Sequence, residues 1–225
     1  MKKALVILSL LSCVQVFGQG NVADMLSAKG YGKNTYAIIV ANEDYQSYSS
    51  VYVENEELAI MEAEKFQQML IKKLGVLPQN IQFYPDALNT NIKLAITKLE
   101  RDIPNNGKII FYYRGKLFSD ERKSDTWIIP VDVSDEETFY MFGMKDLCTR
   151  LSAINKAGIT IFLDAQPGIR AGSASILQNG YSADEVPLVG ARNMELYSLK
   201  LPPPPPIEQP PAAAKKPVLT ITLPT

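Results

Sequence analysis

Short apolar runs alternate with longer amphipathic stretches between residues 35 and 170. The runs are rich in isoleucine, valine and aromatic residues, which is typical of strands that are buried on both faces. They lie at residues 36–40, 80–84, 108–113 and 159–167. Between them, apolar residues recur at helical spacing in the stretches 54–74, 91–102 and 141–155.

This alternation predicts an α/β fold. Parallel strands that are joined by helices make right-handed crossovers, so we expect a three-layer sandwich with a mostly parallel central sheet and helices on both faces. The stretch 126–133 contains Pro130, which cannot donate a hydrogen bond to a neighbouring strand. It therefore predicts a short edge strand or hairpin.

Polar residues follow two of the predicted strands. The third is followed by Arg114, Gly115 and Lys116, and the fourth ends with Asp164 and Gln166. Ligands of parallel sheets usually bind at the carboxyl ends of the strands. We therefore expect two short polar loops that lie side by side and form the candidate site.

A further carboxylate, Asp44, follows the first predicted strand at the same edge. One interpretation pairs Asp44 with Asp164 around a cation or a basic side chain. The other treats both as turn carboxylates that cap nearby backbone groups, which is the common role of such residues.

Composition excludes several classes of function. The chain has His 0, so histidine-ligated metal sites and histidine-dependent catalytic triads are excluded, and we expect no metal and no cofactor. Lys+Arg 23 against Asp+Glu 24 gives a net charge of -1, which offers no basic field for a nucleic acid.

The first 18 residues have the layout of a secretory signal peptide, in which Lys2 and Lys3 precede an apolar run at 4–11. We expect cleavage before Gln19 and export to the periplasm, the cell surface or the medium. The alternative is a lipoprotein box that leaves a lipid anchor on Cys13. The run is too short to predict an integral membrane span. After cleavage before Gln19, only Cys148 remains, and we expect a buried thiol.

The predicted organisation is a signal peptide at 1–18, a leader at 19–34, a domain at 35–199, a Pro/Ala-rich linker at 200–217 and a terminal strand or tail at 218–225. The domain is either complete or cut short at its C-terminal end. The proline run at 202–206 favours polyproline II, either as a spacer or as a docking ligand for an aromatic groove.

Several segments resemble, in order, the catalytic region of the caspase and metacaspase peptidases. They are YAIIVANEDY at 36–45, the Glu62-Ala63 helix, FYYRG at 111–115, WIIPVD at 127–132 and FLDA at 162–165. The similarity extends from about Asn34 to Arg170. It implies a caspase-like three-layer sandwich and the ancestry of a cysteine-type endopeptidase.

The same resemblance implies that the catalytic groups are absent. The family's histidine position corresponds to Lys116, the glycine after it to Leu117, and the cysteine position to Gln166. An amide nitrogen is not nucleophilic, and a lysine is protonated at neutral pH and is a poor base. We therefore expect no caspase-type proteolysis.

The resulting hypothesis is a pseudo-peptidase that binds a protein or peptide, for example an active caspase-like relative. The binding candidates are Arg114, Gly115, Lys116, Asp164, Gln166 and Asp44. The alternative is a peptidase with a non-standard nucleophile, such as Ser173 or Ser175 with Lys116, or one that is completed by a partner chain.

Overall fold

The computed structural model describes residues 21–120, 125–134, 141–154, 157–167, 181–184 and 193–199. The predicted signal peptide, Cys13, the two candidate serines and the proline-rich tail lie outside these residues. Among the helices in the described ranges, none has the length and apolar character needed to cross a membrane.

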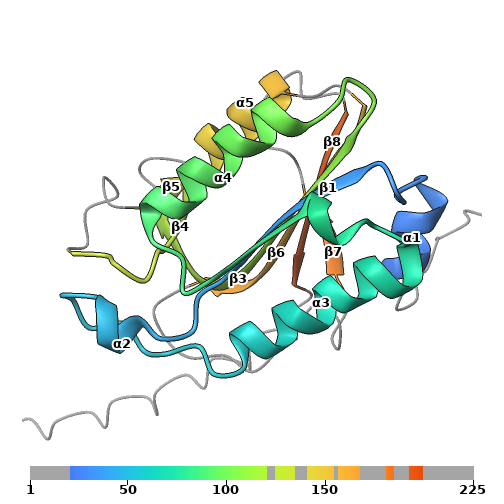
Figure 1. Cartoon of the computed structure of the whole chain (residues 1–225). Helices are drawn as coiled ribbons and strands as arrows, with labels where there is room; N and C mark the ends of the chain where they lie inside the picture. Colours follow the sequence, from blue (N-terminus) through green and yellow to red (C-terminus); the bar gives the residue numbers. More distant parts are fainter. Residues whose placement is uncertain are drawn as a thin grey trace, which may run out of the picture.

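A mixed sheet forms the centre of the molecule (Figure 1). Its parallel core has the order β2-β1-β3-β6-β8, with β7 antiparallel to β8 at one edge and the β4–β5 pair joined to β3. The strands of the core are β1 (Thr35–Ala41), β2 (Ile81–Pro85), β3 (Lys108–Asp120), β6 (Ile159–Pro167) and β8 (Met194–Leu199). The antiparallel strands are β4 (Asp125–Ile128), β5 (Phe142–Gly143) and β7 (Tyr181–Asp184). The expected α/β class and largely parallel core are confirmed.

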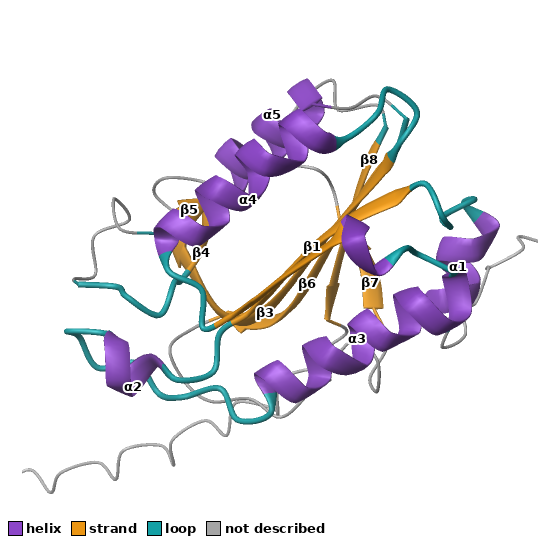
Figure 2. Cartoon of the chain, viewed as in Figure 1, coloured by secondary structure: helices purple, strands orange, loops and turns teal. Residues whose placement is uncertain are grey.

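Helices cover both faces of the sheet (Figure 2). One face carries α1 (Val22–Ala28) and α3 (Ala59–Leu74), and the other carries α4 (Asn89–Asp102) and α5 (Met144–Ile154). The short α2 (Tyr45–Tyr48) follows β1, and a 3-10 turn, η1 (Pro78–Asn80), precedes β2. Because the central strands are apolar on both faces, each face has its own hydrophobic core.

Helix α1 and strands β7 and β8 are among the elements that lie where the sequence predicted none. The predicted leader contains α1, where Asn21 caps the first turn and Leu26 is fully buried against the core under α3. The weakly apolar region before residue 199 contains β7 and β8. Strand β8 alternates, so that Leu196 and Tyr197 enter the cores on opposite faces. Too few apolar residues stand in a row there to give the pattern of a buried strand.

Two predicted boundaries need correction. Strand β3 does not end at Tyr113, because residues 114–116 continue to pair with β6 and residues 117–120 pair with β4. The expected polar loop after Tyr113 is therefore wrong. Helix α3 begins at Ala59 instead of Glu54, because Leu58 has a left-handed backbone with φ of 68°.

Candidate functional site

The two candidate positions Lys116 and Gln166 are neighbours in space. Strands β3 and β6 run parallel, and Lys116 is the register partner of Gln166. Paired strands lie about 4.8 Å apart, so these two positions share the carboxyl edge of the sheet, as expected from the sequence.

Four charged residues at this edge form a buried charge cluster, namely Glu56, Arg114, Lys116 and Asp164. Each is at most 1% exposed. Arg114 Nη2 lies 3.0 Å from Glu56 Oε1, and Lys116 Nζ lies 2.5 Å from Glu56 Oε2. Arg114 Nη1 lies 3.8 Å from Asp164 Oδ1 and donates a hydrogen bond to the Asp164 carbonyl at 3.1 Å. Two cations thus face two carboxylates away from water.

Glu56 was not among the candidates from the sequence. It lies in the 49–58 segment, which connects α2 with α3 and contains no helix or strand. Its N–H donates to the Glu43 carbonyl at 3.0 Å, and its own carbonyl accepts from the Ala59 N–H at 3.2 Å. A glutamate among other acidic residues looks like part of a solvated helix face, so no sequence signal identified its burial.

Buried tyrosines hold the cluster in place. The Lys116 N–H donates to the Tyr45 hydroxyl at 2.9 Å, and the Tyr113 hydroxyl donates to the Lys116 carbonyl at 2.7 Å. The Tyr112 hydroxyl donates to Asp164 Oδ2 at 2.5 Å. Burial raises the pKa of Tyr112 well above its usual value, and the neighbouring Asp164 charge raises this pKa further. The phenol therefore stays protonated and remains a donor.

Gly115 is required between the two cationic residues. Its φ is 154°, and a Cβ at this position would lie 2.6 Å from the Tyr113 hydroxyl and 2.8 Å from the Tyr45 hydroxyl. These distances are far below van der Waals contact. The glycine therefore allows the tyrosines to reach the backbone of Lys116.

The two candidate aspartates have different roles. The Asp44 carboxylate accepts from the Ser47 N–H at 3.2 Å and from the Asn55 side chain at 3.3 Å, and thus caps α2. The hydrogen bonds from Ser47 lower the pKa of Asp44. Asp164 instead belongs to the buried charge cluster. For Asp44, the interpretation as a turn carboxylate that caps local backbone agrees with the structure.

The described part of the site offers little for covalent chemistry. The Lys116 ammonium is engaged by Glu56, and an ammonium has no lone pair with which to accept a proton. Cys148 is fully buried on α5, and burial raises the pKa of its thiol to about 11. Within the described ranges, no three His, Cys, Asp or Glu residues group as metal ligands.

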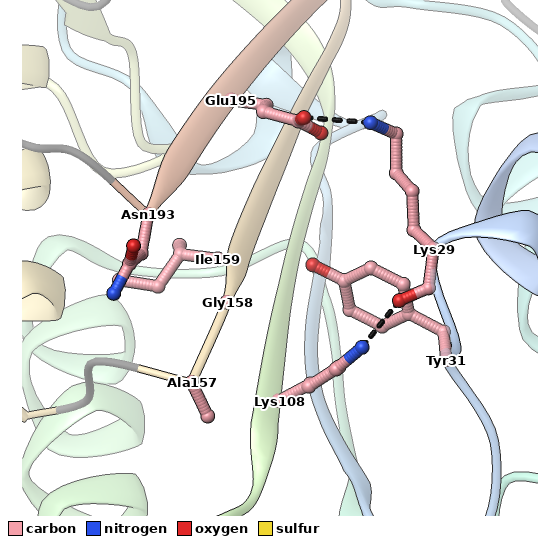
Figure 3. A pocket seen from close by; sticks show the side chains of 8 residues that line it. All are labelled: Lys29, Tyr31, Lys108, Ala157, Gly158, Ile159, Asn193 and Glu195. Atoms are coloured by element: carbon pink, nitrogen blue, oxygen red, sulfur yellow. Dashed lines mark hydrogen bonds and ion pairs between the residues drawn. The ribbon is translucent and has the colours of Figure 1, made fainter.

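A separate pocket of about 170 Å³ opens at the other end of the sheet (Figure 3). It is lined by Lys29, Tyr31, Lys108, Ala157, Gly158, Ile159, Asn193 and Glu195. Lys29 forms an ion pair with Glu195 at 2.6 Å, and the Lys108 ammonium donates to the Lys29 carbonyl. Along β3, Lys108 and Lys116 are roughly 26 Å apart at about 3.3 Å per residue. The pocket is therefore distinct from the candidate site.

No protein-family model matches this chain, and no curated protein matches it. Among solved structures, it is similar to the protein GSU0716 from Geobacter sulfurreducens, with 13% sequence identity and a TM-score of 0.47. The similarity covers 58% of this chain and 49% of that chain, so it spans about half the length of the other protein. We draw no functional conclusion from it.

Proposed function

We propose that this chain is an exported, caspase-like pseudo-peptidase that acts as a protein-binding or regulatory module. The support for a caspase-like origin is the ordered set of similar segments on a largely parallel sheet with helices on both faces. The adjacency of Lys116 and Gln166 at the carboxyl edge is consistent with two former catalytic positions.

The observation that carries the proposal is the state of Lys116. A general base must present a free lone pair within hydrogen-bond reach of its substrate. Lys116 is 0% exposed and its ammonium lies against the Glu56 carboxylate. An ion-paired lysine in the histidine position and an amide in the cysteine position leave a scaffold without the two groups that break a peptide bond.

Loss of proteolysis is tested with the purified mature chain and a panel of fluorogenic peptides, together with a covalent acyl-trapping probe. We expect no turnover and no labelling. Turnover that disappears when Ser173 or Lys116 is replaced by alanine would instead establish a peptidase with a non-standard nucleophile.

Protein binding is tested by a pull-down with two forms of the mature chain, one complete and one that ends at Leu201. A partner that both forms retain binds the globular domain, whereas a partner lost on truncation binds the proline-rich tail. The proposed partner is a protein or peptide, such as an active caspase-like relative. The absence of any specific partner for either form would contradict the binding function.

A further inference from the structure

The cations of the buried charge cluster lie within the sheet, whereas their partner Glu56 lies outside it. Arg114 and Lys116 lie on β3, which pairs with β1 and β6 on its two sides. Their carboxylate partner Glu56 comes from the 49–58 segment, whose backbone belongs to no helix or strand. The two cations are therefore fixed, and the carboxylate is delivered to them by a connecting segment.

We propose that Arg114 and Lys116 form a carboxylate-binding site that Glu56 occupies from within the chain, and that an acidic side chain of a protein partner can replace Glu56. The identity of the ligand as a protein rests on the proposed function, whereas the carboxylate site itself does not. Both oxygens of Glu56 are used, since Oε1 faces Arg114 at 3.0 Å and Oε2 faces Lys116. The carboxylate is thus held by an ion pair at each of its oxygens, one with a guanidinium and one with an ammonium.

The chain next to Glu56 has features expected of a displaceable segment. Leu58 has φ of 68°, a left-handed conformation that residues with a branched or bulky side chain rarely adopt. Leu58 is also 52% exposed, and Tyr52 is 72% exposed. These two side chains contribute little to holding the segment against the domain, and its buried apolar anchor is Val53, which is 3% exposed.

Displacement must overcome a strong internal competitor. A group tethered beside its site acts at an effective concentration of about millimolar or higher. A single external carboxylate therefore cannot compete in the wild-type chain, and a partner must make further contacts. Tyr52 and Leu58 offer exposed apolar surface near Glu56 in the chain for such contacts.

The test removes the internal carboxylate and supplies another. Glu56→Ala deletes two carbons with their carboxylate oxygens, and acetate is that same two-carbon fragment. Thermal unfolding of the mature full chain is measured in sodium acetate and in sodium chloride at equal ionic strength. We expect acetate to raise the Tm of the variant by roughly 3 °C or more above its value in chloride.

Glu62→Ala is the matched control. Glu62 is also buried, at 3% exposure, but its ion-pair partner Lys65 has a side chain that is 51% exposed. For the control and for the wild-type chain, we expect the Tm in acetate to equal the Tm in chloride. An equal response of Glu56→Ala to the two salts, or the same acetate gain in Glu62→Ala, would overturn the proposal.

A variant that does not fold in chloride still gives a decisive result. Refolding yield, followed by circular dichroism, then replaces Tm as the measurement. Folding that occurs in acetate but not in chloride supports the site, and failure in both overturns it.

A peptide tests replacement by a side chain. A fluorescent peptide with the sequence of residues 52–58 is compared with a version that has glutamine in place of Glu56. By fluorescence anisotropy, we expect the acidic peptide to bind Glu56→Ala at least about tenfold more tightly than it binds the wild-type chain, because the internal competitor is gone. Equal binding of the acidic and the glutamine peptide would overturn the proposal that an external acidic side chain can replace Glu56. Acetate rescue without any partner in the pull-down would leave the site in place and refute only the protein-binding function.

Discussion

The two ends of the sheet use the same kind of ion pair in opposite environments. At the carboxyl end, Lys116 and Glu56 lie 2.5 Å apart with side chains that are 0% and 2% exposed. At the amino end, Lys29 and Glu195 lie 2.6 Å apart with side chains that are 32% and 44% exposed. The distances are nearly equal, so burial decides how much each pair contributes to the stability of the fold.

The difference arises from what covers each end. At the carboxyl end, the Tyr45 hydroxyl accepts from the Lys116 N–H, and Tyr45 belongs to a small hydrophobic cluster with Val53, Trp127, Ile129 and Val131. At the amino edge, the pocket leaves Lys29 and Glu195 in contact with solvent. A desolvated charge depends on its partner, whereas a solvated charge has water as an alternative.

Removal of the buried Glu56 carboxylate should have the largest effect on stability. Glu56→Ala leaves Arg114 and Lys116 short of a carboxylate inside the protein, and we expect a loss of about 3–5 kcal/mol in the free energy of unfolding. Urea denaturation monitored by tryptophan fluorescence measures this loss. A loss below about 1 kcal/mol would show that the carboxyl-end pair behaves like a surface pair.

A methyl group at Gly115 should have the next largest effect. Gly115→Ala places a Cβ within 2.8 Å of two tyrosine hydroxyls at a backbone φ of 154°. We expect a loss of roughly 2–4 kcal/mol from overpacking and backbone strain. Gly32→Ala is the control, because a Cβ there meets its nearest atom at 3.6 Å. Equal stability of the two variants would contradict the tight packing around Lys116.

Tyr31 is a buried residue at the amino end of the sheet, and it should make the free energy of unfolding depend on alkaline pH. Burial raises the pKa of Tyr31 from 10.0 to about 12, because the folded protein disfavours the phenolate. The stability that this tyrosine contributes is therefore complete below pH 10 and is lost as the pH rises toward about 12. The loss corresponds to roughly 2–3 kcal/mol at about 1.4 kcal/mol per pKa unit.

Urea denaturation of the wild type and of Tyr31→Phe between pH 8 and pH 12 measures this contribution. The variant should lose less stability over the alkaline part of this range. Some decline should remain in the variant, because burial also raises the pKa of Tyr112 and Tyr113. Identical pH profiles for both proteins would be evidence against a perturbed Tyr31.

The exposed ion pair should give the smallest effect. A double-mutant cycle with Lys29→Ala and Glu195→Ala is expected to yield a coupling of about 0–1 kcal/mol, and added salt should reduce it further. The carboxyl-end pair should keep its coupling in salt. A coupling at Lys29–Glu195 as large as the effect of Glu56→Ala would remove the distinction between the two ends.

The sequence was informative wherever burial produces a repeated pattern. The apolar runs identified β1, β2, β3 and β6, and helical spacing identified α3, α4 and α5, because strands covered on both faces and helices covered on one face restrict residue type at many positions. The sequence also predicted that Lys116 and Gln166 lie at the same edge of the sheet, since parallel strands end together, and the strand register agrees. Strand β8 and helix α1 were missed because neither has a long apolar run.

The sequence by itself therefore determined a largely parallel sheet between helices and the absence of histidine from the chain. Only the tertiary structure decided that Arg114 and Lys116 are buried and that Glu56 is their partner. The physical reason is that burial of a charge depends on which distant segment covers it. Glu56 and Lys116 are separated by β2, α3 and α4 in the chain, and no local pattern of residues records their contact.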